Sequence, residues 1–189
     1  MTDYASEFET KRMVYIPHAL DIDTVNKLNN EMHLLQIQGE TKHDDQCPLS
    51  HSYYNAPEAE KAGRAMTEPL SKLLDLDLDY AYCYARIYQP GEILAPHTDR
   101  ESCEISATMT LGHYVDDDIW PIYMGVDAED NVGTPITIGI GDMVMYHGRE
   151  LLHWREPYQG KWQTQVFFHY VQKDGEFAEH ANDGVVVPK

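Results

Sequence analysis

Three side chains in the second half of the chain have the types and the spacing of a metal site. His97 and Asp99 are two positions apart at the end of an expected strand, so their side chains leave the same face. His153 follows 54 positions after Asp99, on another expected strand. Two imidazoles and one carboxylate form a facial triad with three open coordination positions, which suits non-haem Fe(II). Such a centre can bind a bidentate ligand and still admit O2.

The motif alone has a simpler alternative. The chain has ten histidines, so a His-x-Asp pair with a distant histidine also arises by chance. In that case the segment is a polar strand end whose histidine hydrogen-bonds to nearby backbone. The surrounding sequence favours the metal site, because the pair follows a Tyr-x-Pro-Gly turn at 88–91 and precedes a series of strands.

Composition limits the class of protein. The 189 residues favour a single domain, and 42% of them are hydrophobic, which is typical of a globular chain. The 14 Lys+Arg against 32 Asp+Glu give a net charge of −18, which disfavours nucleic acid and anionic membranes as partners. No apolar run approaches the about 20 residues of a membrane helix. The beginning of the chain also lacks a basic segment followed by an apolar one, so we expect no signal peptide.

Cysteine usage points to a compartment. Cys47, Cys83 and Cys103 are an odd number without a Cys-x-x-Cys pair. This pattern argues against a disulfide framework or a zinc ribbon and fits a reducing environment. We therefore expect a soluble cytoplasmic protein with three free thiols.

The elements that must position these residues come in two groups. Apolar residues three and four apart predict a first helix around 24–35, and a polar stretch over 40–56 predicts a long loop. A second helix is expected to begin at Pro57 and to be kinked or ended by Pro69. From Tyr80 the periodicity changes to two, and turn signals separate about eight expected strands, at 80–88, 104–111, 120–125, 134–139, 142–147, 150–155 and 163–171, with the His97 segment between the first two.

Helices followed by many strands predict an α+β fold, with the helices packed on one outer face of a β-sandwich. The expected organisation is one domain over 1–189. It has an N-terminal helical support region at 1–79, a β core at 80–171 and a C-terminal tail at 172–189. The tail is polar and is expected to be irregular.

The β region resembles the catalytic core of the Fe(II)/2-oxoglutarate-dependent dioxygenases, in the prolyl-hydroxylase-like branch. The resemblance covers about half of the chain, and its matching pieces are Arg-Ile-Tyr-Gln-Pro-Gly at 86–91, His-Thr-Asp-Arg at 97–100, Cys-Glu-Ile-Ser at 103–106, Gly-Asp at 141–142 and His-Trp-Arg-Glu at 153–156. It implies a double-stranded β-helix, the jelly-roll or cupin-like fold. It also implies Fe(II) held by His97, Asp99 and His153.

The same resemblance implies a reaction. 2-Oxoglutarate and O2 would be consumed, a substrate would be hydroxylated, and succinate and CO2 would be released, with ascorbate as a candidate reductant. The substrate is not identified by the sequence. A prolyl side chain of a peptide, a free amino acid and a small metabolite all stay open.

One departure from the branch concerns the cation that pairs with the far carboxylate of 2-oxoglutarate. The branch has Arg or Lys nine or ten positions after the distal histidine, where this chain has Trp162 and Gln163. A buried carboxylate still needs a cation, and a guanidinium binds it in a bidentate way. Arg155 lies two positions after His153, so it should share the inward face; Arg86 is the second candidate.

Hydroxyl groups complete the expected co-substrate site. The resemblance assigns Tyr88 to the position whose hydroxyl helps to bind the carboxylate, although an ordinary half-buried strand tyrosine is the alternative. Thr108 and Thr110 share a face with Ser106 and could add hydroxyl donors. Gln165 and His169 are weaker candidates for supporting the metal ligands.

Two other functions compete with the oxygenase. One is a non-enzymatic β-sandwich binding module in which the three metal-type residues are coincidental. The other is a cupin-like metal dioxygenase that needs no 2-oxoglutarate. Cupins supply three histidines and a glutamate at tighter spacing, and the long interval before His153 argues against that alternative.

Overall fold

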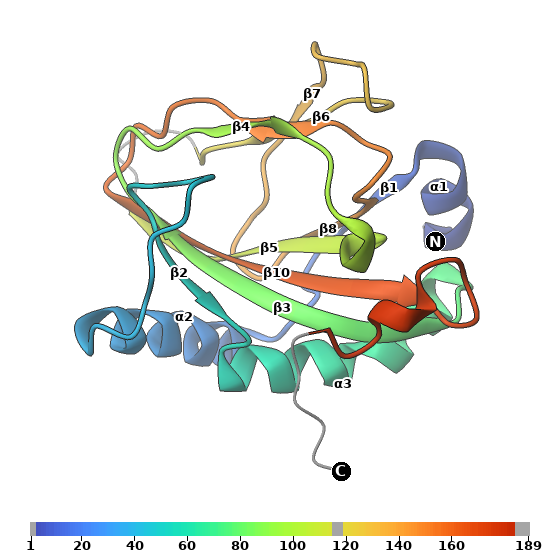
Figure 1. The fold of residues 1–189 in the computed structure, drawn as a ribbon, viewed down its shortest axis with the longest axis horizontal. Coiled ribbons are helices and arrows are strands. Elements are labelled where there is room, and N and C mark those ends of the chain that lie inside the picture. Colours follow the sequence, from blue (N-terminus) through green and yellow to red (C-terminus); the bar gives the residue numbers. More distant parts are fainter. Residues whose placement is uncertain (1–2, 115–118, 184–189) are drawn as a thin grey trace.

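Two β-sheets face each other, and two long helices lie under the larger sheet (Figure 1). This computed structural model describes residues 3–114 and 119–183. The larger sheet has the order β1 (Met13–Ile16), β8 (Met143–His147), β5 (Ile105–Tyr114), β10 (Trp162–Gln172), β3 (Leu78–Tyr88) and β2 (His51–Tyr54). The smaller has the order β4 (Leu94–His97), β9 (His153–Arg155), β6 (Ile122–Met124) and β7 (Thr134–Ile136). Neighbouring strands are antiparallel in both sheets, and the predicted α+β double-stranded β-helix is confirmed.

The helices supply one wall of the main core. They are α1 (Tyr4–Lys11), α2 (Ile22–Ile37) and α3 (Pro57–Leu74), and short 3-10 turns occupy Glu101–Cys103 and Ala178–His180. The carboxylate of Asp21 accepts from the backbone of Thr24 and caps α2, while Pro57 occupies the first turn of α3, where no N–H is needed. Gly63 of α3 lies against the rings of Tyr80 and Phe168, so any side chain there would collide with the sheet.

Alternation along the central strands separates two environments. On β3, Cys83, Ala85 and Ile87 are buried in the core between the larger sheet and the helices. Tyr84 and Arg86 face the other way, into the space between the two sheets, where they line a cavity. The polar and aromatic face of this strand therefore lines the interior of the double-stranded β-helix, as its period of two predicts.

The structure departs from the sequence predictions at three places. The region 1–79 is not purely helical, because β1 and β2 join the two edges of the larger sheet, and β2 falls in the stretch expected to be a loop. Both strands have four residues, too few for a clear period. Pro69 does not end α3, which continues to Leu74, and Met66, Leu70 and Leu74 are buried on both sides of it.

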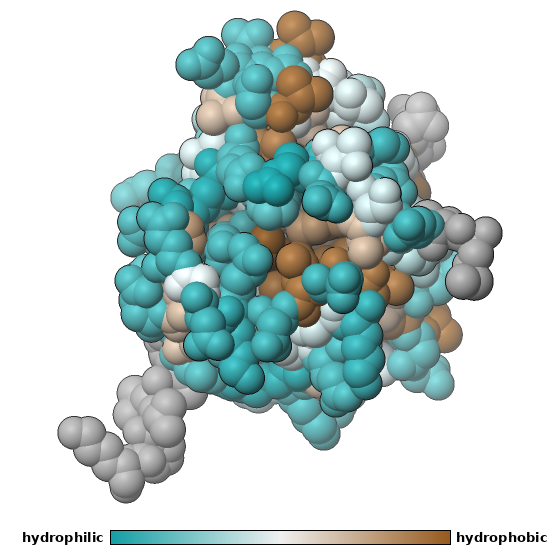
Figure 2. All heavy atoms as spheres, turned by 90° about the vertical axis from the view of Figure 1, so that its right-hand side faces the viewer, coloured by the Kyte–Doolittle hydropathy of each residue, from teal (hydrophilic) through white to brown (hydrophobic). Residues whose placement is uncertain are grey.

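The surface is largely hydrophilic on the face that Figure 2 shows. Apolar residues gather in the middle and at the top of this face. In the described ranges, none of the helices is long and apolar enough to cross a membrane. The cytoplasmic location stays a prediction, and residues 184–189 of the expected tail lie outside the described residues.

Candidate active site

His97, Asp99 and His153 converge although they come from distant parts of the sequence. The antiparallel pairing of β4 with β9 places His97 directly opposite His153, and their rings are 4.2 Å apart between centroids. One carboxylate oxygen of Asp99, Oδ1, lies 3.7 Å from His97 Nε2 and 3.5 Å from His153 Nε2. All three ligand atoms lie within 4.8 Å of one another, a spacing that one metal ion can span.

Backbone carbonyls orient both imidazoles. His97 Nδ1 lies 2.9 Å from the carbonyl oxygen of Ala95, and His153 Nδ1 lies 2.9 Å from that of Leu151. Each carbonyl oxygen accepts a hydrogen bond from Nδ1, which leaves Nε2 as the free end of both rings. The two Nε2 atoms point toward Asp99, and rings oriented in this way by a backbone carbonyl are common around protein-bound metals.

Asp99 is held by a chain of polar groups from the larger sheet. Ser106 Oγ donates to Asp99 Oδ2 at 2.7 Å and lies 3.0 Å from His169 Nδ1. Burial raises the pKa of Asp99, but the His153 imidazole and the Ser106 hydroxyl outweigh it and lower the pKa to about 2. Burial also lowers the pKa of His169 to about 4, so this ring is neutral and donates to Ser106. Gly148 permits the contact, because a Cβ there would collide with both Asp99 and Ser106.

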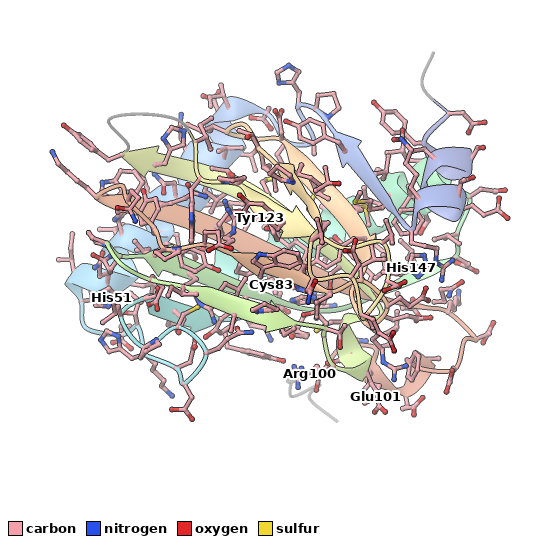
Figure 3. The ribbon with its side chains drawn as sticks, turned by 90° about the horizontal axis from the view of Figure 1, so that it is seen from above. His51, Cys83, Arg100, Glu101, Tyr123 and His147 are labelled. Atoms are coloured by element: carbon pink, nitrogen blue, oxygen red, sulfur yellow. The ribbon has the colours of Figure 1, made fainter. Side chains whose placement is uncertain are left out.

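A cavity of about 530 Å³ opens onto these three residues. Its walls combine aromatic, polar and apolar side chains. Figure 3, seen from above, shows Arg100 beside Glu101 at one edge of the molecule, and Arg100 is part of the cavity lining. The lining comprises Asp44, Gln46, Tyr54, Tyr82, Tyr84, Arg86, Leu94, His97, Thr98, Asp99, Arg100, Cys103, Ile122, Tyr146, His153, Phe167 and His169.

Arg86 lines this cavity, but both of its terminal nitrogens are already engaged, and only Nε lacks a partner among the described residues. Nη2 donates to the carboxylate of Asp44 at 2.8 Å and to Gln46 Oε1 at 3.1 Å. Nη1 donates to Cys47 Sγ at 3.1 Å and to the hydroxyl of Tyr88 at 3.3 Å. Arg86 therefore fixes the segment after α2 against the wall of the cavity, and its charge is neutralised within the protein.

Arg155 is the opposite case. It is 1% exposed, its Nη1 donates to the Trp120 carbonyl at 2.8 Å, and its guanidinium lies 4.8 Å from the centre of the Trp120 ring. Its Nε and Nη2 have no hydrogen-bond partner among the described residues. Burial lowers the pKa of Arg155, since nearby phenol and thiol groups do not compensate for lost water.

The parity prediction for Arg155 places it on the cavity side but not in the open cavity. Leu94, its cross-strand partner, lines the cavity, and paired residues share one face of a sheet. Leu94 and Phe167 also pack in the apolar cluster that contains Trp120. These two side chains therefore belong both to the cavity lining and to the cluster around Trp120, which Arg155 contacts.

Two further residues have buried polar atoms without a partner, and each is linked to a neighbour of Arg155. Within the part of the chain that the structure describes, the Tyr158 hydroxyl and both side-chain polar atoms of Gln163 are buried without a partner. Tyr158 packs against Trp120, with ring centroids 4.8 Å apart, and Gln163 lies opposite Tyr88 across β10 and β3. Arg155, Tyr158 and Gln163 are called the arginine cluster below.

The hydroxyl candidates lie inside the double-stranded β-helix, where protein groups already bind them. Tyr88 is fully buried and accepts from Arg86. Thr108 Oγ1 donates to Gln165 Oε1 at 3.3 Å, and Thr110 Oγ1 donates to the Ile138 carbonyl at 2.9 Å. Contact of these three hydroxyls with a co-substrate stays a prediction.

Sequence reasoning did not single out Tyr146, Tyr158, Asp44 or Gln46. Asp44 and Gln46 belong to an irregular segment, whose path no periodicity predicts. Tyr146 had a usable signal, because it alternates with Met143 and Met145, which face the helices. The same parity argument that was applied to Arg155 would have placed the Tyr146 side chain inside.

Comparison with known proteins gives a structural relationship only. No family profile matches this sequence, and no curated protein matches it. A prolyl-4-hydroxylase from Pseudomonas putida superposes with a TM-score of 0.72 at 18% identity, covering 89% of this chain and 97% of that one. HygX from Streptomyces hygroscopicus, solved with nickel and 2-oxoglutarate, gives 0.69 at 14% identity, with 92% and 88% covered. A Trichoplax adhaerens prolyl hydroxylase with a hypoxia inducible factor peptide gives 0.70 at 9%, with 95% and 91% covered.

These similarities establish the fold. The chain has the double-stranded β-helix of the Fe(II)/2-oxoglutarate oxygenases over most of its length, as the sequence motifs implied. At these identities the likeness carries no residue assignment, so the roles of individual side chains must come from the geometry of this chain.

Proposed function

We propose that this protein is an Fe(II)- and 2-oxoglutarate-dependent oxygenase that hydroxylates a substrate bound in the 530 Å³ cavity. The observation that supports this most strongly is the convergence of His97 Nε2, His153 Nε2 and an Asp99 oxygen on the cavity floor. The oxygenase fold of the structural neighbours supports the same conclusion independently. A binding module does not need two oriented imidazole lone pairs beside a buried carboxylate.

The donor set fits Fe(II). His97, Asp99 and His153 would hold the metal, and three coordination positions would stay open for co-substrate and O2. When bound, the metal supplies the oxidative chemistry that replaces a substrate C–H bond by C–OH as 2-oxoglutarate becomes succinate and CO2. Ser106 and His169 keep the Asp99 carboxylate in place. Leu94, Ile122 and Phe167 make the floor apolar and exclude water from it.

Arg155 is the proposed anchor of the far carboxylate of 2-oxoglutarate. Two of its N–H-bearing nitrogens are unpartnered, and a buried cation without an anion is costly, so the arginine cluster fits an incoming carboxylate. Tyr158 and Gln163 would add hydrogen bonds. Arg86 is less suited, because Asp44 already neutralises it.

The substrate is proposed to be a peptide, an amino acid or another small molecule. Three tyrosines, Asp44 and Gln46 line the outer cavity, which offers ring faces and hydrogen-bonding groups to a polar ligand. Neighbours of this fold were solved with a peptide fragment and with hygromycin B, so both kinds of ligand are compatible with the fold.

The test is turnover of 2-oxoglutarate to succinate by protein reconstituted with Fe(II) under air. A panel of prolyl peptides, amino acids and small polar metabolites is compared with no added substrate, and His153→Ala is the control. Metal-dependent succinate formation that His153→Ala lacks is the expected result. Metal binding without 2-oxoglutarate binding would favour the cupin-like dioxygenase, and no metal binding would favour the non-enzymatic module.

A further inference from the structure

Tyr146 of β8 reaches the same point as the three ligand-type residues. Its ring is 2% exposed and packs with Ile122 and Val144, and it meets the His153 ring edge-on at 4.9 Å between centroids. In the register of β5 with β8, Tyr146 lies opposite Ser106. Two neighbouring hydroxyls of the larger sheet therefore face the site, and the Ser106 hydroxyl is already bound to Asp99.

The Tyr146 hydroxyl lies at the nitrogen that a metal would use. Its oxygen is 3.4 Å from His153 Nε2, close to the 3.5 Å that separates Asp99 Oδ1 from the same nitrogen. Because Nδ1 of this ring bonds to the Leu151 carbonyl, Nε2 is the ring atom that faces the Tyr146 hydroxyl, and a neutral ring would accept a hydrogen bond from it there.

A metal ion at His153 Nε2 removes this acceptor. The buried phenol then needs another acceptor, and the Ser106 hydroxyl beside it already donates to Asp99. An ion held by these three residues alone would leave positions open beside them, and a bidentate 2-oxo acid bound there would place an oxygen next to His153.

We propose that the Tyr146 hydroxyl donates a hydrogen bond to the co-substrate oxygen that lies next to His153 on the metal. This inference rests on the proposed function, and it makes Tyr146 a residue that positions the 2-oxo acid. As a donor and not a ligand, Tyr146 leaves all three coordination positions free. Its hydroxyl acts at the metal end of the co-substrate, and Arg155 acts at the other.

The experiment compares wild type, Tyr146→Phe and Tyr170→Phe. Phenylalanine keeps the ring packing and removes the hydroxyl only. Tyr170 is the matched control, because it is fully buried on the helix side of β10 and its hydroxyl donates to the Gly63 carbonyl at 3.0 Å. Two quantities are measured without oxygen: the affinity of the Mn2+ form for 2-oxoglutarate, and the visible charge-transfer absorption of the Fe(II) form with 2-oxoglutarate.

Tyr146→Phe is expected to weaken 2-oxoglutarate about tenfold or more and to shift the absorption band, since a hydrogen bond to a charged oxygen is lost. Metal affinity should not fall, and Tyr170→Phe should match wild type in both measurements. Unchanged affinity and an unchanged band in Tyr146→Phe would overturn the inference. So would an intense phenolate-to-iron band in the Fe(III) wild type that Tyr146→Phe lacks, since Tyr146 would then be a ligand. A wild type that shows no 2-oxoglutarate-dependent band would instead contradict the proposed function.

Discussion

The three metal-type residues and the arginine cluster lie in the same β-helix but differ in how their polar atoms are satisfied. Each of His97, Asp99 and His153 has a hydrogen-bond partner that fixes it, a backbone carbonyl or Ser106. Arg155, Tyr158 and Gln163 together have five buried polar atoms with no partner in the described ranges. The metal-type residues are therefore oriented to bind one ion. The arginine cluster needs hydrogen-bond partners from a bound molecule to satisfy its polar atoms.

Removing a metal-type residue should have the largest effect. Each of His97→Ala, Asp99→Ala and His153→Ala leaves two ligands where three are needed, so we expect binding of Mn2+ to be abolished and turnover with it. Titration of Mn2+ followed by electron paramagnetic resonance measures this, with one ion per chain in wild type. Full metal affinity in His153→Ala would mean that a different residue is the third ligand.

Removing Arg155 should affect the co-substrate and leave the metal in place. The loss of a charge-assisted pair to a carboxylate predicts about a tenfold to hundredfold weaker affinity for 2-oxoglutarate in Arg155→Ala. Calorimetric titration of the Mn2+ forms measures it, with Arg86→Ala as the matched variant. A large loss in Arg86→Ala with none in Arg155→Ala would transfer the role to Arg86.

The buried histidine beside Asp99 should make the metal-free protein sensitive to acid. Burial lowers the pKa of His169 to about 4, below its unfolded value, so the unfolded chain binds more protons between these two values. Its contribution to stability is present above the unfolded pKa and decreases as the pH falls toward 4. Between pH 7 and pH 5 we expect His169 to account for about 2 kcal/mol of lost stability.

Urea denaturation of metal-free wild type and His169→Gln at pH 7 and pH 5 measures how much of the lost stability is due to His169. The variant should lose about 2 kcal/mol less than wild type over the same interval. Equal losses in the two proteins would show that His169 is not held neutral.

The smallest effect is expected at Ser106. Ser106→Ala removes the hydroxyl that holds Asp99 Oδ2 but keeps all three metal-type residues. Metal affinity should fall about tenfold, as is usual when a partner of a metal ligand is lost. Competition with a fluorescent Mn2+ chelator measures it, and Thr108→Ala, whose hydroxyl bonds to Gln165 instead, is the control. A loss of the same size in both variants would point to general loosening of the strand.

Much of the fold could be predicted from the sequence, because the face on which a strand residue lies depends on periodicity. The period of two from Tyr80 onward puts Arg86 and Cys83 on opposite faces of the strand, and the structure has Arg86 in the cavity lining and Cys83 in the main core. Arg155 was aimed inward by parity with His153, and its place opposite Leu94 agrees. Parity fixes the face that a strand residue presents but not its depth, so it could not show that Arg155 is absent from the lining of the open cavity.

The features that could not be predicted from the sequence depend on contacts between distant segments. Asp44 meets Arg86 through an irregular segment, and β1 and β2 are short edge strands whose pairing is set by the sheet they join. Pro69 stays inside α3 because burial of Leu70 and Leu74 offsets the lost backbone hydrogen bond. None of these outcomes is encoded in a local pattern.

One measurement tests the central claim most directly: a crystal structure of the protein with Mn2+ and 2-oxoglutarate, with the metal located by anomalous scattering. The account predicts one metal peak bound by His97, Asp99 and His153, and a 2-oxoglutarate molecule whose far carboxylate lies on Arg155. A metal peak away from these residues would contradict the account. So would a far carboxylate bound to Arg86 while Nε and Nη2 of Arg155 still have no partner.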